Sequence, residues 1–230
     1  RSYSELANYV QAYEQKMIMK RENIAERGIW TAKKRYILNV WNSEGVQYSE
    51  PKLKVMGIEA VKSSTPAPCR QMIKDGLKLM MNGTEEDVIE FIDKCRVEFK
   101  ALPPEQIAFP RTVSDVRKYH SHSSIYSKGT PIHARGALLF NHYIKDKKLT
   151  NKYSLIANGE KIKFLYLKKP NIIQENVISF IQDFPHELGL DKYIDYDLQF
   201  EKSFVEPLKA ILDAIGWNVE KTVNLELFFA

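Results

Sequence analysis

The stretch GIWTAKKRYILNVW, residues 28–41, places three consecutive cations, Lys33, Lys34 and Arg35, inside a run of aromatic and β-branched side chains. Aromatic and β-branched residues are typical of strands. We therefore predict a strand over residues 29–41. Side chains alternate between the two faces of a strand, so Lys33 and Arg35 would share one face and Lys34 the other.

Two explanations fit positive charge in the middle of such a strand. Lysines at the edge of a sheet protect it against aggregation. Alternatively, the long cationic side chains reach phosphate groups of a nucleic acid. Both explanations stay open from the residues alone, and Tyr36 favours the second slightly because an aromatic ring beside cations can contact sugars and base edges.

The segments around this stretch predict a helix followed by a hairpin. Residues 4–20 carry apolar side chains at spacings of three and four, which is typical of an amphipathic helix. Residues 46–56 predict a second strand, and residues 42–45 have the composition of a four-residue hairpin loop.

Further along the chain, helical patterns dominate. We predict helices over residues 69–81, 85–100, 132–145 and 196–215. The second begins after Thr84, a candidate N-cap, and its first turn holds three consecutive acids, which suit the helix dipole better than a metal ion. A short hairpin is predicted around Asn158–Gly159, because Asn-Gly is a strong turn signal.

Composition bounds the function without fixing it. The chain has 230 residues, a net charge of +5 and a pI near 9.0, which favours a polyanionic partner. Cys69 and Cys95 lack metal-ligand spacing, so we expect a reduced, intracellular protein. No apolar run approaches the roughly 20 residues that span a bilayer, so we expect no membrane partner. The chain begins with Arg1, so we expect a processed product or a piece of something longer.

Motifs for catalysis are weak. His120 and His122 form an H-x-H pair in a polar segment without nearby cysteine or carboxylate support. Asp195 and Asp197 are two residues apart on a predicted helix and would point to different faces. The chain contains no Walker loop, no GxGxxG and no nucleophile elbow. We therefore predict no catalytic residue and no metal ligand in this chain.

Three ordered motifs carry a family resemblance: KKRY at residues 33–36, PKLKVMGIEAVKSSTP at residues 51–66 and IDYDLQFEKSFVEPLKAIL at residues 194–212. On these motifs the chain resembles the C-terminal portion of family B DNA polymerases of the tailed-phage branch. The resemblance implies an α+β fold: the C-terminal part of a palm (helix plus β-hairpin), then a mainly helical thumb with a small hairpin. The implied domains are palm over residues 1–60, thumb over 61–220 and a tail over 221–230.

The resemblance also implies which side chains touch primer–template DNA. They share positive charge or hydrogen-bonding capacity and come from the palm's end, the palm–thumb connection and the thumb: Lys33, Lys34, Arg35, Tyr36, Lys62, Ser63, Thr65, Lys128, His133, Arg135, Lys161 and Lys202. A polymerase holds any sequence, so such contacts should go to phosphates and the minor groove. For His133, a hydrogen-bonded, partly buried histidine remains an equal alternative.

The family's two-metal chemistry needs palm aspartates, including those of a DTD-type motif, which this sequence does not contain. The resemblance therefore implies part of a DNA-directed DNA polymerase, a nucleotidyltransferase, that is inactive alone and binds no cofactor itself. The complete enzyme would use Mg²⁺ and an N-terminal exonuclease, fingers and palm part. It would work in the cytoplasm of an infected bacterial host.

The last residues resemble the peptide with which such polymerases bind a sliding clamp, and nominate Leu225, Leu227, Phe228 and Phe229. An apolar leucine followed by paired aromatics suits a hydrophobic pocket. Alternatively, these aromatics fold back on the thumb core. The competing function is a non-catalytic accessory subunit or interaction module that binds a sliding clamp and DNA.

Overall fold

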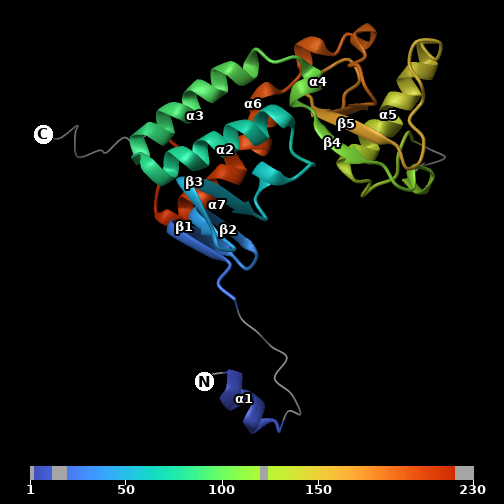
Figure 1. The fold of residues 1–230 in the computed structure, drawn as a ribbon. Helices are drawn as coiled ribbons and strands as arrows, with labels where there is room; N and C mark the ends of the chain where they lie inside the picture. The colour runs from blue at the N-terminus through green and yellow to red at the C-terminus, as the bar shows by residue number, and fades with distance from the viewer. Residues whose placement is uncertain (1–2, 12–19, 120–123, 221–230) are drawn as a thin grey trace, which may run out of the picture. The chain divides into compact units, whose positions relative to one another are not determined.

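The computed structural model describes residues 3–11, 20–119 and 124–220, which form helices and two three-stranded antiparallel sheets (Figure 1). The predicted α+β class is confirmed. The chain divides into two compact units: one combines the chain before residue 29 with residues 38–54, and the other combines residues 29–37 with the chain after residue 54.

The first sheet has the order β1-β2-β3, with β1 at Asn23–Ala32, β2 at Arg35–Ser43 and β3 at Val46–Met56. The prediction of a strand over residues 46–56 is confirmed, but the single strand over residues 29–41 is wrong. The chain turns at Lys33 and Lys34, and Lys34 has a φ of +62°, in the left-handed region that strands do not use. The sequence hides this turn because lysine is not a typical turn residue. Lys33, Lys34 and Arg35 therefore do not alternate between the two faces of one strand.

The second turn of this sheet is tighter than predicted. Glu44 and Gly45 connect β2 to β3, and their φ values of +51° and +90° are both positive, as a type I′ hairpin turn requires. The loop thus has two residues, not four. Asn42, placed in the loop by the prediction, lies in β2, and its Oδ1 accepts a hydrogen bond from the Gly45 amide at 3.2 Å.

The N-terminal helix α1 covers Tyr3–Tyr9, so it begins near the predicted start and ends earlier than the predicted residue 20. Residues 12–19 of the prediction lie outside the described residues. Within the described ranges, no helix combines the length and the apolar character needed to cross a bilayer.

Helices α2 (Ala67–Asn82) and α3 (Glu85–Lys100) confirm the two predicted helices and lie side by side (Figure 1). Thr84 caps α3 as predicted. Its hydroxyl accepts from the Asp87 amide at 3.3 Å, while the Asp87 carboxylate accepts from the Thr84 amide at 2.8 Å. Hydrogen bonds from the Thr84 amide and hydroxyl to the Asp87 carboxylate lower the pKa of Asp87. At least this acid of the first turn serves the helix start.

The C-terminal helical region consists of α6 (Tyr196–Phe200), a π-helical segment (Glu201–Val205) and α7 (Glu206–Ile215). The predicted helix over residues 196–215 is confirmed, with an irregularity at its centre. Pro207 has no N–H, so it cannot donate to the carbonyl four residues earlier. In the π segment the Glu206 amide donates instead to the Glu201 carbonyl, five residues back.

Aromatic rings fill the core beneath these helices. The ring of Phe200 lies 5.2 Å from that of Phe99 on α3 and 5.0 Å from that of Phe204. The buried Cys69 thiol on α2 contacts the Ser203 hydroxyl at 3.3 Å. Burial raises the pKa of Cys69 to about 11, so this thiol stays protonated at neutral pH. The ring of Phe204 in the π segment also lies 6.4 Å from that of Phe91 on α3, so the π segment contacts both long helices.

The second sheet has the order β4-β5-β6, with β4 at Phe109–Thr112, β5 at Lys161–Tyr166 and β6 at Val177–Phe180. Both pairings are antiparallel; Phe109 lies opposite Phe164, and Phe164 opposite Ser179. No helix or strand was predicted between residues 100 and 132, so β4 was missed.

The predicted hairpin around Asn158–Gly159 is wrong in its pairing. The Asn158 side chain accepts from the Asp115 amide, and the Gly159 amide donates to the Val113 carbonyl at 2.7 Å. These bonds attach the turn to the chain just after β4. As a result β5 pairs with β4 and β6, and the residues before the turn form no strand.

Helix α5 (Ile132–Asp146) confirms the helix predicted over residues 132–145 and packs on β6. Gly136 allows this contact, because a Cβ there would lie 2.4 Å from the Ser179 hydroxyl and 2.9 Å from the Ser179 backbone nitrogen. The same hydroxyl donates to the His133 carbonyl at 3.0 Å. The sheet therefore fixes the first turns of α5.

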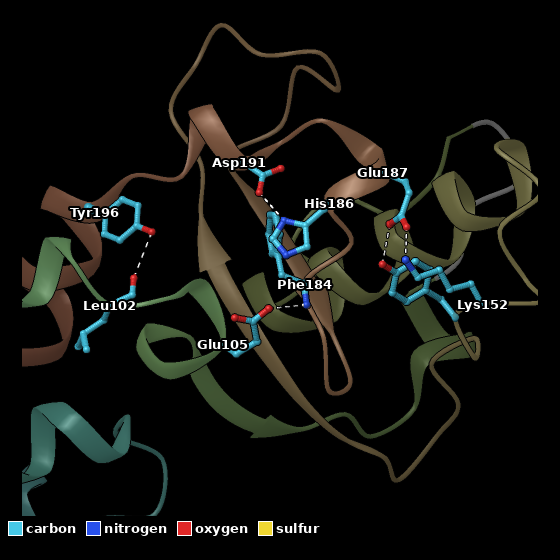
Figure 2. Close-up of polar contacts among 9 residues, drawn as sticks. Leu102, Glu105, Lys152, Phe184, His186, Glu187, Asp191 and Tyr196 are labelled. Atoms are coloured by element: carbon cyan, nitrogen blue, oxygen red, sulfur yellow. Dashed lines mark hydrogen bonds and ion pairs between the residues drawn. The ribbon is translucent and has the colours of Figure 1, made fainter.

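The loop after β6 is tied down by polar contacts (Figure 2). The Glu105 carboxylate, on the short helix α4 (Pro104–Ile107), accepts from the Phe184 amide at 2.9 Å. The Glu187 carboxylate accepts from Lys152 and, at 2.6 Å, from the Tyr153 hydroxyl. The hydrogen bonds from these two partners lower the pKa of Glu187 to about 2. Short 3₁₀ helices lie at Glu59–Val61, Val116–Tyr119, His186–Leu188 and Asp191–Tyr193.

Candidate nucleic-acid interface

The turn between β1 and β2 presents Lys33 and Lys34, both exposed. It rests on Gly57, which has a φ of +68°; a Cβ at Gly57 would lie 2.2 Å from the Lys34 carbonyl oxygen. Neither lysine has a carboxylate partner among the described residues. The structure thus offers two adjacent cations at the tip of a hairpin, a position from which both can reach one phosphate backbone.

Arg35 and Lys62 converge on one carboxylate, that of Glu59. The guanidinium of Arg35 donates at 3.0 and 3.4 Å, and the ammonium of Lys62 donates at 2.8 Å. Partial burial raises the pKa of Glu59, but the hydrogen bond from Lys62 and the charges of Arg35 and Lys62 outweigh it and leave that pKa below its ordinary value. Two cations share one anion here, so their net attraction for phosphate is that of a single positive charge.

Ser63 and Thr65, also nominated from the sequence, have different surroundings. Ser63 is exposed, whereas Thr65 is only 5% exposed, and its amide donates to the Lys62 carbonyl at 3.2 Å. Thr65 therefore shapes the turn before α2, and Ser63 offers its hydroxyl to a ligand.

Arg111, on β4, is a functional candidate that the sequence did not reveal. One guanidinium nitrogen donates to the Ser64 carbonyl at 2.9 Å and to the Pro110 carbonyl at 3.0 Å. The guanidinium also lies 5.9 Å from the centre of the Phe109 ring. Phe109 and Arg111 are two residues apart on β4 and so share one face of the strand, and no motif in the sequence marked this arginine. This residue links the turn before α2 to the second sheet.

Arg111 acts on two further groups. Burial and the charge of Arg111 lower the pKa of His133 at the start of α5. Burial raises the pKa of Tyr166 on β5, against the charges of Lys202 and Arg111. We call Ser64, Arg111, His133, Tyr166 and Lys202 the Arg111 cluster. It combines cations, an aromatic hydroxyl and an imidazole from five separate segments, which suits hydrogen bonding to phosphate and sugar oxygens.

The remaining nominated residues differ in availability. Lys128 and Lys161 are exposed and have no carboxylate partner in the part of the chain that the structure describes. Arg135 is half-buried; it donates to Asn176 and lies 5.7 Å from the centre of the Tyr126 ring. One nitrogen of its guanidinium is therefore used within the fold, while Nε is buried without a hydrogen-bond partner among the described residues.

Two nominated residues are only partly available to a ligand. Tyr36 is half-buried at the start of β2, next to the fully buried Ile37. Lys202 is exposed in the π segment and forms an ion pair with Glu206, which raises the pKa of the lysine. An incoming phosphate would have to compete with this carboxylate for the ammonium group.

The acidic candidates have structural partners. The Asp195 carboxylate caps α6 by accepting from the Leu198 amide at 3.1 Å. Asp197 pairs with Lys100 at 2.7 Å and lies 3.8 Å from Lys168. Across residues 3–11, 20–119 and 124–220, no three His, Cys, Asp or Glu side chains gather in a way that could hold a metal ion.

Several nominated residues lie outside the described residues. They are the H-x-H pair and the apolar side chains of the tail: His120, His122, Leu225, Leu227, Phe228 and Phe229.

Comparison with known proteins gives two relatives. The chain is 30% identical over 240 residues to the DNA-directed DNA polymerase of Enterobacteria phage T4 and 33% identical over 238 residues to that of Escherichia phage RB69. The similarity covers 99% and 98% of this chain but 26% of each relative, so the chain spans about a quarter of their length. No protein-family model matches the chain. The resemblance to phage DNA polymerases, first drawn from three motifs, is confirmed along nearly the whole chain.

Proposed function

We propose that this chain is the C-terminal palm and thumb portion of a family B DNA polymerase of the tailed-phage type, and that it grips primer–template duplex DNA. The observation that carries the proposal is the similarity to two phage polymerases along almost the entire chain. The net charge of +5 agrees with a polyanionic partner.

The grip uses two surfaces of the second unit. The Lys33–Lys34 turn contacts the primer backbone near its growing end, and the Arg111 cluster contacts phosphates further along the duplex. Lys128 and Lys161 add exposed positive charge. These groups recognise phosphate, so binding is independent of base sequence and weakens steeply as salt rises.

Nucleotidyl transfer requires the remainder of the enzyme. The described residues offer no cluster of metal ligands, so we assign no catalytic step to them. Mg²⁺ and the palm aspartates would act in an N-terminal exonuclease, fingers and palm part. The complete polymerase would bind its sliding clamp through the last residues of this chain and work in the cytoplasm of an infected host.

The salt dependence of binding tests the proposal. We expect Lys34→Gln to weaken binding of the chain to a primer–template duplex and to lower the slope of log Kd against log salt by about one unit, because one phosphate contact is lost. Fluorescence anisotropy with a labelled duplex, over a series of salt concentrations, measures both quantities. Lys94→Gln, which removes one exposed cation from α3, serves as the matched control.

Two results would contradict the proposal. An unchanged slope with a lower melting temperature in Lys34→Gln would mean that the lysine serves the hairpin alone. Incorporation of nucleotides by the purified chain with Mg²⁺ would mean that the catalytic carboxylates lie within it.

The pH dependence of binding tests His133. Burial and Arg111 hold its pKa below the ordinary value near 6.5, so the free chain carries a neutral imidazole at pH 7. A phosphate at this position would raise the pKa in the complex, so binding takes up a proton. We therefore expect affinity for duplex to rise as the pH falls from about 8 to about 5.5, and His133→Gln to remove most of this rise.

Anisotropy titrations at several pH values measure the effect at constant ionic strength. His142→Gln, on the same helix, is the matched control and should keep the pH dependence. If His133→Gln keeps it too, then His133 does not face phosphate, and the hydrogen-bonded structural role remains.

A further inference from the structure

A cavity of about 1090 Å³ lies between the segment after β4, helix α5 and the chain that precedes β5. Ligand pockets usually measure roughly 300–1,000 Å³, so its size suits a small organic molecule. None of the residues assigned above to duplex binding lines it. The cavity is therefore separate in its residues from the proposed grip.

The walls of this cavity are held by hydrogen bonds within the chain. Asn141 on α5 binds the backbone of Ile156 twice: its amide nitrogen donates to the Ile156 carbonyl at 2.8 Å, and its oxygen accepts from the Ile156 amide at 2.7 Å. Two residues after Ile156, the Asn158 side chain accepts from the Asp115 amide. These bonds hold the walls at Asn141, Ile156 and Asp115 in place before any ligand binds, which reduces the entropic cost of binding.

The cavity has two chemically distinct parts. Its apolar surface comes mainly from the partly exposed side chains of Ile125 and Leu155, since Leu138 and Ile156 are buried behind it. Three permanent cations, Arg117, Lys118 and Lys145, also line it. An apolar surface bordered by cations suits a ligand with a flat or apolar body and an anionic group.

The cations of the cavity are not balanced locally. Its described lining residues include three basic side chains and one carboxylate, that of Asp115, so positive charge is in excess. None of the three cations forms an ion pair with another described residue. Since neighbouring cations repel one another, an anion between them would be stabilised.

We propose that this cavity binds a nucleotide, with its phosphate held by Arg117, Lys118 and Lys145 and its base against the aliphatic wall formed by the partly exposed side chains of Ile125 and Leu155. Inorganic phosphate would use the cations alone, and an uncharged nucleoside would use the aliphatic wall alone. A nucleoside phosphate uses both. The same chemistry is available from a free nucleotide and from the terminal nucleotide of a single strand.

Calorimetric titration of the full chain tests the proposal. We expect deoxyadenosine monophosphate to bind about tenfold or more tightly than inorganic phosphate or deoxyadenosine, because it alone engages both parts of the cavity. Lys145→Glu should weaken this binding about tenfold or more through charge reversal. Lys148→Glu makes the same change of charge three residues later, at a side chain outside the cavity, and should leave binding unchanged.

Two further measurements distinguish a free nucleotide from the end of a single strand and control for misfolding of the variant. A 5′-phosphorylated single-stranded octamer that binds more tightly than the monophosphate indicates a strand end as the natural ligand, and equal binding indicates a free nucleotide; both support the proposal. Arg117→Gln repeats the test if circular dichroism shows that Lys145→Glu is unfolded. Equal affinities for monophosphate and inorganic phosphate, or equal effects of Lys145→Glu and Lys148→Glu, would overturn it. So would an equal loss of duplex affinity in Lys145→Glu, which would place the cavity within the duplex grip.

Discussion

Replacing Arg111 with alanine is expected to weaken binding of the chain to primer–template duplex by about 10–100-fold, which corresponds to the loss of one charged hydrogen bond at roughly 1.5–3 kcal/mol. The guanidinium donates to the Ser64 carbonyl at 2.9 Å. Its positive charge helps to lower the pKa of His133 and opposes the rise in the pKa of Tyr166. Its removal therefore takes away a phosphate ligand and releases the segment that carries Lys62 and Ser63.

Two comparisons identify the cause of that loss. Arg111→Lys keeps the charge but loses the planar fork, so we expect an intermediate affinity and a salt slope close to that of the unchanged chain. Arg96→Ala is the matched control, since this arginine lies 5.1 Å from the centre of the Phe200 ring and outside the Arg111 cluster. Anisotropy titrations measure each affinity, and thermal melts measure folding. Equal loss of affinity in Arg96→Ala and Arg111→Ala would show that bulk charge, not this cluster, governs binding.

Replacing Gly57 with alanine is expected to lower the free energy of unfolding by roughly 3 kcal/mol or more, a size reserved for backbone strain and overpacking. Two costs add. Gly57 has a φ of +68°, which disfavours a Cβ, and that Cβ would lie 2.2 Å from the Lys34 carbonyl oxygen. A backbone atom cannot move aside as a side chain can, so the Lys33–Lys34 turn must shift. Duplex affinity should therefore fall as well.

Gly159→Ala separates the two costs. Gly159 has a φ of +84°, but no heavy atom lies within 4 Å of the position that an alanine methyl group would take, so alanine there carries the conformational cost alone, about 1–2 kcal/mol. Urea unfolding of both variants gives the difference between them, and anisotropy gives the duplex affinity. If Gly57→Ala is no less stable than Gly159→Ala, the close approach between Gly57 and the lysine turn is not a constraint.

Local patterns predicted much of the helical part of the fold. Thr84, three acids and an apolar stripe predict a helix over residues 85–100, and α3 has those bounds. Capping and periodicity act within a few residues, so the sequence expresses them directly. The motifs that indicated a phage polymerase are equally local, and the comparison with two relatives agrees with them.

The candidate interface was only partly predictable. The cations of KKRY were visible, but their place at a hairpin tip was not, because that turn fits over Gly57, more than twenty residues later. Asn158 and Gly159 do form a turn, as predicted. Their hydrogen bonds, however, go to the chain after β4, so β5 pairs with β4 instead of with the residues before the turn. Pairing partners are chosen by the burial of whole strands, which a local motif does not encode.

The sequence by itself determined the long helices and the positive charge, because propensity, capping and composition are properties of neighbouring residues, and the α+β class followed from the family resemblance of its motifs. The tertiary structure alone decided which charges remain available for a ligand. Glu59 forms ion pairs with Arg35 and Lys62. Arg135 contacts Asn176 and Tyr126, and Arg111 binds the Ser64 carbonyl, which is distant in sequence. Electrostatic and hydrogen-bonding partners depend on distance in space, and only the folded chain sets those distances.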